Sequence, residues 1–242
     1  MTTASIILLF LFAVGASFVQ RVSGFGFGIF IMTVLPYLMP SYGESTTLSG
    51  LLASVTSLLI VIKLWKHIHW KNLWPILITF LIVSFFSVQC IALAGDGTLK
   101  RILGAVLILV SLYFFFLSKR ITVKPTLAIQ GTMGTISGLM GGFFAMQGPP
   151  AVLYFLASEK TKEDYVAITQ SYFLIGNICM TFYRAGNGFL TPAVGIAWCY
   201  GLAAVFIGTT IGAKVFDRIS AETLRKVIYI YMGICGLVAL LS

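Results

Sequence analysis

Two glycine-rich stretches decide the fold of this chain: Ser23-Gly24-Phe25-Gly26-Phe27-Gly28 and Gly141-Gly142-Phe143-Phe144-Ala145-Met146-Gln147-Gly148-Pro149-Pro150. Each interrupts an otherwise apolar run, the first near the start of the 242 residues and the second just past their middle. Glycine frees the backbone for unusual dihedral angles, and proline suits the first turn of a helix that begins anew. The two stretches therefore predict broken helices at corresponding places in two halves of the chain.

The composition indicates an integral membrane protein. Hydrophobic residues make up 59% of the chain and charged residues only 10%, far from the composition of a soluble domain. Several apolar runs reach the roughly 20 residues that a helix needs to cross a bilayer. The first run, Met1 to Ala16, has no preceding Lys or Arg, which favours a retained helix over a cleaved signal. The net charge of +9 comes from cations in short connectors, a pattern of membrane orientation that gives no support to nucleic-acid binding.

Apolar runs bounded by charge, Gly and Pro predict an all-α protein whose two halves share one order of spans. We expect an N-terminal repeat over residues 1–120 and a C-terminal repeat over 121–242, together forming one transmembrane domain. Each repeat should contain a Gly-broken hairpin helix and three transmembrane helices. A short match before the last span of each half supports the duplication. The expected spans are 4–22 with 27–39, 46–64, 75–94 and 102–118, then 126–142 with 149–158, 165–184, 193–212 and 227–241.

The placement of Lys and Arg tests whether the halves run parallel or inverted, because these residues concentrate on the cytoplasmic side of spans. If each glycine-rich segment crosses the membrane, the cations divide almost evenly between the two sides. If each segment instead returns to the side from which it entered, twelve of the 16 cations lie inside and Arg21 lies within the membrane, which leaves outside only Lys100, Arg101 and Arg184. The charge pattern thus predicts inverted repeats with both chain termini external.

The breaks are predicted to bind a small anion. Backbone N–H groups at a helix start are unpaired and carry about half a positive charge. Two such starts that converge near the midplane of the bilayer would form an anion site, with Gly28 and Gly148 nearest to the ligand. The candidate substrate-binding residues are Arg21, Ser23, Gly24, Gly26, Gly28, Ser57, Gly141, Gly142, Gln147, Gly148, Pro149 and Asn177.

Most of these residues also have a purely structural interpretation. Glycines let membrane helices pack closely, so any single glycine can serve packing alone. Arg21 is a cation inside an apolar run, where it either holds an anion or extends its charge to the interface. Asn177, with Ser57 as its counterpart in the first half, either contacts the ligand or only bonds between helices.

The sequence predicts neither an enzyme nor a bound cofactor or metal. All seven acidic residues fall in or beside connectors, so no carboxylate is available at the midplane for a proton relay or for catalysis. The four cysteines lie inside spans without a C-x-x-C spacing. His67 and His69 share one connector and would need partners elsewhere in the chain to hold a metal ion, so a solvated loop is the preferred interpretation.

The glycine motifs resemble those of the sulfite exporter TauE/SafE family, also described as an anion and organosulfonate permease family. The resemblance rests on Gly24-Phe25-Gly26-Phe27-Gly28, on Gly141-Gly142 followed by Gly148-Pro149-Pro150 and Val152-Leu153-Tyr154, and on the repeat across essentially the whole chain. It implies a multi-pass protein of the bacterial inner membrane that moves sulfite, a sulfonate or a related sulfur-containing or carboxylated anion.

Export by alternating access is the function that these expectations favour. The membrane potential itself favours export of an anion from a negative interior, so no coupling ion is required. An anion channel and a non-transporting membrane scaffold or assembly factor are the alternatives. The expected partners are the anion and the lipid bilayer, and the sequence leaves a homodimer open.

Overall fold

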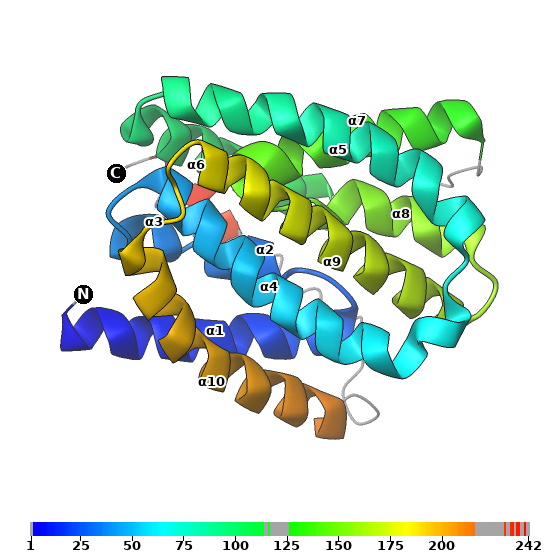
Figure 1. Cartoon of the computed structure of the whole chain (residues 1–242), viewed down its shortest axis with the longest axis horizontal. Helices are drawn as coiled ribbons and strands as arrows, with labels where there is room; N and C mark the ends of the chain where they lie inside the picture. The colour runs from blue at the N-terminus through cyan, green and yellow to red at the C-terminus, as the bar shows by residue number, and fades with distance from the viewer. Residues whose placement is uncertain are drawn as a thin grey trace.

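The computed structural model describes residues 2–113, 116 and 126–215, together with residues 230, 233, 234, 236, 237 and 240. Within these residues the chain is helical and contains no strand. The helices form one bundle in which the long helices run roughly side by side (Figure 1). The expected span 227–241 lies mostly outside the described residues.

The described helices follow the spans expected from the sequence to within six residues at each boundary, and α6 differs most, because it begins and ends six residues before the expected span 102–118. Among the described residues, α1, α4 with η1, α5 and α10 are long and apolar enough to cross a membrane. The elements are α1 Thr3–Ser23, α2 Phe27–Ile31, α3 Leu35–Leu38, α4 Tyr42–Leu64, the 3-10 turn η1 Trp65–His67, α5 Trp70–Leu93, α6 Asp96–Leu112, α7 Leu127–Phe144, α8 Gly148–Ser158, α9 Lys162–Gly186 and α10 Pro192–Val215.

Polar caps start the helices that follow the two broken segments. Ser41 Oγ accepts a hydrogen bond from the Glu44 N–H, and the Glu44 carboxylate accepts one from the Ser41 N–H. This capping box begins α4. Thr161 caps α9, because its hydroxyl oxygen accepts from the N–H of Asp164. The corresponding helices of the two halves thus begin with the same kind of signal.

Both predicted breaks are present, and each begins with a left-handed residue. Gly24 ends α1 in the left-handed conformation at φ 84°, and α2 begins three residues later at Phe27. Ala145 ends α7 in the left-handed conformation at φ 56°, and α8 begins three residues later at Gly148. Ala145 is the one described non-glycine residue with a positive φ. A left-handed residue at the end of a helix turns the chain sharply, so each break reverses its direction.

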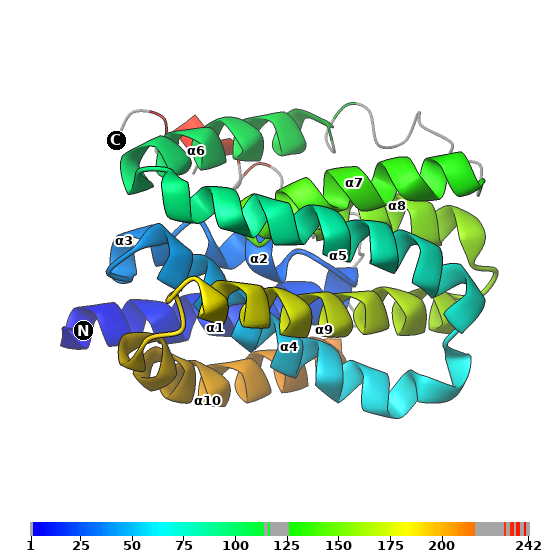
Figure 2. The same ribbon diagram turned by 45° about the horizontal axis from the view of Figure 1, so that its top comes forward.

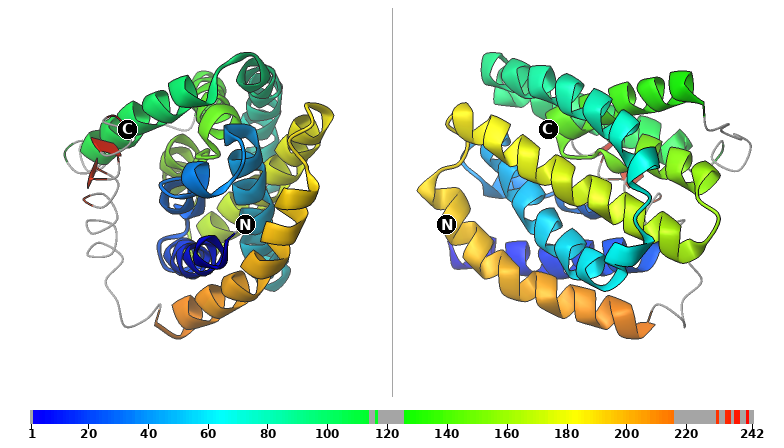
Figure 3. Two further views of the ribbon diagram at one scale, coloured as in Figure 1. Left: turned by 90° about the vertical axis from the view of Figure 1, so that its left-hand side faces the viewer. Right: turned by 45° about the vertical axis from the view of Figure 1, so that its right-hand side comes forward.

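The two broken segments enter the bundle from opposite ends. In Figure 1, α1 starts at the left end, and α2 and α3 return toward that end. By contrast, α7 starts at the right end and α8 returns to the right, as the turned view also shows (Figure 2). Seen end-on, α9 and α10 lie on the periphery, whereas the returning segment α2–α3 lies inside (Figure 3). The apolar side chains of Phe27, Ile31 and Met32 are accordingly buried.

The helices of one half pack on helices of the other. The extensive pairs are α1 with α10, α5 with α7, and α4 with α9. Glycine permits the close approach of two of these pairs. A Cβ on Gly138 of α7 would lie 3.0 Å from the carbonyl oxygen of Phe80 in α5, and a Cβ on Gly208 of α10 would collide with the carbonyl oxygen of Val14 in α1. Small residues therefore serve helix packing at these positions.

Candidate functional site

The two breaks touch each other. A Cβ on Gly28 of α2 would collide with the carbonyl oxygen of Ala145 in the second break. At the start of α8, a Cβ on Gly148 would lie 3.5 Å from Cβ of Phe25 in the first break. The fold therefore joins two segments that are far apart in the sequence, as expected for a site shared by two halves.

A small cavity lies where the breaks meet. Its volume is about 20 Å³, which is enough for about one water molecule. Five of the predicted site residues line it, namely Gly26, Gly28, Gln147, Gly148 and Asn177. None of its lining residues is charged. The rest of the lining consists of Gln20, Phe27, Ile29, Ala53, Ala145, Met146 and Phe173.

Asn177 presents an unused hydrogen-bond donor at this cavity. Gln147 Nε2 donates to Asn177 Oδ1 over 2.8 Å, so the oxygen of the Asn177 amide is occupied. Within the described part of the chain, its Nδ2 group has no partner, although the residue is only 2% exposed. An acceptor that entered the cavity could take a hydrogen bond from this N–H group.

A second polar network lies beside the cavity. Gln20 Nε2 donates to Ser57 Oγ and to Gln170 Oε1, both over 2.9 Å. Gln170 Nε2 in turn donates to the carbonyl oxygen of Gly24 over 2.7 Å. These bonds tie α1, α4 and α9 to the first break, and we call the group Gln20, Ser57 and Gln170 the glutamine latch. Ser57, a predicted ligand residue, belongs to this latch and does not line the small cavity.

A larger cavity of about 750 Å³ begins on the other side of the latch. Gln20 lines both cavities, so the latch separates them. The volume lies within the range of about 300–1,000 Å³ that is typical of small-ligand pockets. Three predicted residues, Arg21, Ser23 and Gly24, line this cavity. The Ser23 hydroxyl donates to backbone carbonyl oxygens of Val19 and Phe25.

The charged residues of the large cavity include both signs. Its cations are Arg21, Lys160 and Lys162, and its carboxylates are Glu159 and Glu163. Four of them lie in the α8–α9 connection or in the first turn of α9, at the end of the bundle that also carries η1 (Figure 2). Arg21 is therefore a half-buried wall residue of this cavity, at a distance from the point where the breaks meet.

Arg184 is the fully buried cation of the described chain, with 0% exposure. Its Nη1 donates to the carbonyl oxygen of Thr46 over 3.1 Å, and its Nη2 donates to those of Gly141 and Gly142 over 2.9 and 3.2 Å. Gly141 and Gly142 belong to the last turn of α7, where the helix dipole is negative. Carbonyl groups therefore stabilise this guanidinium, and within the described residues no carboxylate pairs with it.

The sequence analysis counted Arg184 among the external cations. The structure buries its side chain inside the bundle, and the side of the membrane to which this end of α9 belongs stays a prediction. Asn177 and Arg184 are seven residues apart, almost two helical turns, and so share one face of α9. This seven-residue spacing is the sequence feature that could have indicated that Arg184 faces the same way as Asn177. A Cβ on Gly50 would lie 3.2 Å from Arg184 Nη1 and 3.7 Å from Asn177 Oδ1, so both groups flank the same point of α4.

Gly141 and Gly142 do not line the small cavity, and their role as ligand residues stays a prediction. They pack closely, since a Cβ on Gly141 would lie 2.8 Å from the ring of Phe80, and one on Gly142 would collide with the side chain of Ser87. Both contacted residues belong to α5. The packing interpretation therefore holds for these two glycines, and their carbonyl groups hold Arg184.

The helix starts at the breaks offer fewer amide donors than expected. Pro149 and Pro150 occupy the first turn of α8 and have no N–H, so Gly148 supplies the one amide donor among its first three residues. Pro149 is buried and does not line the cavity. The other start belongs to α2, which has only 5 residues, too few for a substantial dipole. Side-chain amides are the main polar groups around the cavity.

Comparison with known proteins supports the interpretation of these motifs. The chain matches the family model "Sulfite exporter TauE/SafE" over residues 9–239. It is 24% identical over 224 residues to "Probable sulfite/organosulfonate exporter TauE" of Cupriavidus necator, and the match covers 88% of this chain and 85% of that protein. No solved structure matches. The family match begins inside α1 and spans both breaks and every later helix described above, and the chain therefore belongs to the sulfite exporter TauE/SafE family of membrane transport proteins.

Proposed function

We propose that this protein exports sulfite or an organosulfonate by alternating access, with the anion bound where the two breaks meet. The carrying observation is the unpartnered Nδ2 group of Asn177 at the small cavity, close to the guanidinium of Arg184. Sulfite and sulfonate groups present several oxygen acceptors around one sulfur atom. An amide donor backed by a buried cation suits such a ligand, and the absence of carboxylates from the cavity lining avoids repulsion.

The large cavity supports a route to this site. Its wall carries three cations, Arg21, Lys160 and Lys162, against two carboxylates, Glu159 and Glu163, and this excess of positive charge favours anions. The glutamine latch separates this cavity from the smaller one, which holds about one water molecule and is too small for sulfite. Binding therefore requires the latch to part and the Gln147–Asn177 hydrogen bond to open, which frees Gln147 Nε2 to donate to the anion alongside Asn177 Nδ2. On the far side of the site, Arg184 closes the space between α4, α7 and α9.

The packing of the helices supports inverted repeats. Exchanging α1 with α7, α4 with α9 and α5 with α10 converts the α1–α10 pair into the α7–α5 pair and leaves the α4–α9 pair unchanged. A two-fold relation between the halves has this property. The broken segments also enter from opposite ends (Figure 1). In transporters built this way, rocking of the halves around a fixed central site alternates access between the two faces.

The distribution of cations gives the proposed orientation in the bacterial inner membrane. Lys63, Lys66, Lys71, Lys160 and Lys162 all belong to the end of the bundle with η1 and the α8–α9 connection. Positive residues of short loops favour the cytoplasmic side. The large cavity then faces the cytoplasm, where an exporter takes up its substrate, and the start of α1 is external.

Flux in liposomes tests the function. Reconstituted protein should move sulfite or ethanesulfonate at a rate that saturates with concentration, since each cycle binds one anion. Asn177→Ala should weaken binding by at least about tenfold, because a hydrogen bond to a charged group contributes about 1.5–3 kcal/mol. Asn187→Ala is the matched control, because Asn187 lies just beyond the end of α9 and its amide donates to the carbonyl oxygen of Tyr183. Linear, unsaturable flux would indicate a channel, and flux unchanged by Asn177→Ala would overturn the site.

A further inference from the structure

Two histidines of the first half meet two carboxylates of the second half at the connector end of the bundle. His67 Nδ1 lies 3.1 Å from Asp164 Oδ1, and His69 Nδ1 lies 2.6 Å from Glu159 Oε2. His67 ends η1, His69 precedes α5, and the two carboxylates flank the α8–α9 connection. The histidines are about half exposed, as a solvated loop requires, but the fold supplies the partners that the sequence alone did not reveal.

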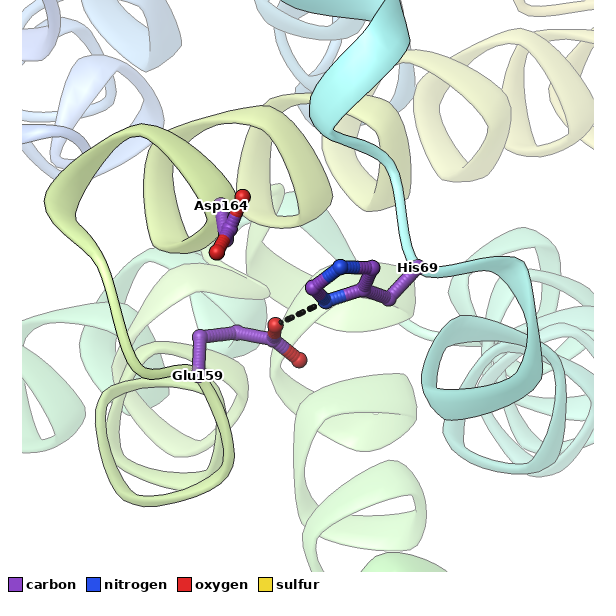
Figure 4. A group of neighbouring side chains, drawn as sticks. All are labelled: His69, Glu159 and Asp164. Carbon is purple, nitrogen blue, oxygen red and sulfur yellow. Dashed lines mark hydrogen bonds and ion pairs between the residues drawn. The ribbon is translucent and has the colours of Figure 1, made fainter.

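The donor atoms are close enough to share one ion. His69, Glu159 and Asp164 each offer a ligand atom, and these atoms all lie within 4.8 Å of one another. Figure 4 shows the imidazole of His69 and the two carboxylates converging on one space. Zinc binds imidazole nitrogen and carboxylate oxygen at about 2.0–2.2 Å, so neighbouring ligand atoms of a tetrahedral site lie about 3.3 Å apart. Small side-chain rotations suffice, and the His69 side chain is 52% exposed and therefore has room to turn.

The carboxylate of Glu159 is already held in place. Its side chain is only 1% exposed, and Asn72 Nδ2 donates to its Oε1 over 2.9 Å, which leaves Oε2 facing His69. Such outer hydrogen bonds orient metal ligands and raise affinity in known sites. Asp164 lies in the first turn of α9, before its apolar part.

We propose that His69, Glu159 and Asp164 form a binding site for a divalent transition-metal ion, with Zn²⁺ as the best fit, and that His67, 3.1 Å from Asp164, orients that carboxylate. One imidazole and two carboxylates are a donor set that suits this ion. His69 binds as a neutral ligand, and the ion takes the place of the hydrogen now shared between its imidazole and Glu159. The site lies away from the small cavity and uses none of its residues.

The bound ion would clamp the two halves together at the mouth of the large cavity. It would join the α4–α5 connection of the first half to the α8–α9 connection of the second, and Glu159 itself lines that cavity. This consequence rests on the proposed transport function, since an exporter that must rock between two states would be slowed by the clamp. Metal binding itself does not depend on transport.

Titration calorimetry with Zn²⁺ on the detergent-purified protein tests the site. We expect one ion per chain and a higher melting temperature. His69→Ala and Glu159→Gln should each lower the affinity by at least about tenfold, and Asn72→Ala should lower it by a comparable factor through the loss of orientation. Glu163→Gln is the matched control, because Glu163 lies beside Asp164 but outside the cluster. This variant should bind Zn²⁺ with the affinity of the parent protein.

The outcomes separate the two proposals. Absence of Zn²⁺ binding, or binding that persists unchanged in both His69→Ala and Glu159→Gln, overturns the metal site whatever the transport result. Each variant is checked by its size-exclusion profile, and His69→Ala removes a half-exposed side chain whose loss the fold tolerates. If the protein binds Zn²⁺ but transports no anion, the proposed metal site is supported and the proposed export function is overturned.

Discussion

The backbone of Gly28 rests against the carbonyl oxygen of Ala145, and this contact joins the two breaks. One residue belongs to the short helix α2 of the first half, and the other ends α7 of the second half. No side chain separates the two backbones. The small cavity therefore has a floor made of main chain from both halves, whose shape depends on the absence of a Cβ at residue 28.

Gly28→Ala should disrupt both the fold around the site and transport. The new methyl group would collide with the Ala145 carbonyl group, and the cost of overpacking is about 1–3 kcal/mol. Gly131→Ala in α7 is the matched control, because a Cβ there has no atom within 4 Å, and Ala in a helix is more stable than Gly. Thermal unfolding in detergent should show a lower midpoint for the first variant and an equal or higher midpoint for the second. Equal unfolding midpoints for the two variants would contradict the close contact between Gly28 and the Ala145 carbonyl group.

Arg184→Gln should weaken anion binding more than Arg184→Lys does. Both variants lose part of the hydrogen bonding to the Thr46, Gly141 and Gly142 carbonyl groups, but the lysine keeps the positive charge near Asn177. We expect at least a tenfold rise in the dissociation constant of ethanesulfonate for Gln, measured by calorimetry. Arg101→Gln, at an exposed cation of α6, controls for net charge and should leave the constant unchanged. Equal constants for Gln, Lys and the parent would refute the role of the buried charge.

Gln20→Ala should open the latch between the two cavities. Gln20 donates two of the hydrogen bonds that hold the latch, and each contributes about 0.5–1.5 kcal/mol. In a cysteine-free background, Ala53→Cys places a thiol in the lining of the small cavity. A water-soluble thiol reagent should modify this cysteine about tenfold faster when Gln20→Ala is also present. Lys160→Cys, in the large cavity, should react rapidly in both backgrounds, and a slow, unchanged reaction of Ala53→Cys would show that the latch is not the barrier.

The inverted arrangement predicts which loops share a face of the membrane. With returning hairpins, Lys66 and Lys162 lie on the cytoplasmic face and Gly97 on the opposite face. Single cysteines at these positions should therefore differ in labelling when an impermeant thiol reagent is added to intact cells. Gly97→Cys should react, because a side chain there meets no atom within 4 Å, and the other two should react only after the membrane is opened. Labelling of Lys162→Cys but not Lys66→Cys in intact cells would mean that the second segment crosses the membrane.

The sequence was most informative where a residue type forces a backbone geometry. Gly24 and the pair Pro149-Pro150 marked the breaks, and five predicted residues line the cavity between them. It was least informative about side chains whose role depends on a distant partner. Gln20 gained its role only because α4 and α9 bring Ser57 and Gln170 beside it, and no local pattern encodes that meeting.

The two arginines Arg21 and Arg184 also show that the role of a side chain depends on distant partners. Arg21 stood out because apolar residues surround it in sequence, yet it lines the wall of the large cavity. Arg184 was only one of three cations counted as external, yet three backbone carbonyl groups from α4 and α7 accept hydrogen bonds from it. Carbonyl groups leave no mark in the sequence, so the solvation of a charge by main chain is visible only once the fold is known.

The pairing of α1 with α10 has a consequence for how the protein is made. The ribosome inserts α1 first, whereas the glycines that receive it, Gly208 and Gly212, emerge almost two hundred residues later. Until α10 has been synthesised, α1 lies in the lipid without the helix on which it packs. The first half therefore lacks helix contacts that complete its core. Assembly must therefore finish after synthesis of the second half, and a truncated chain that stops before residue 192 should be cleared by membrane proteases.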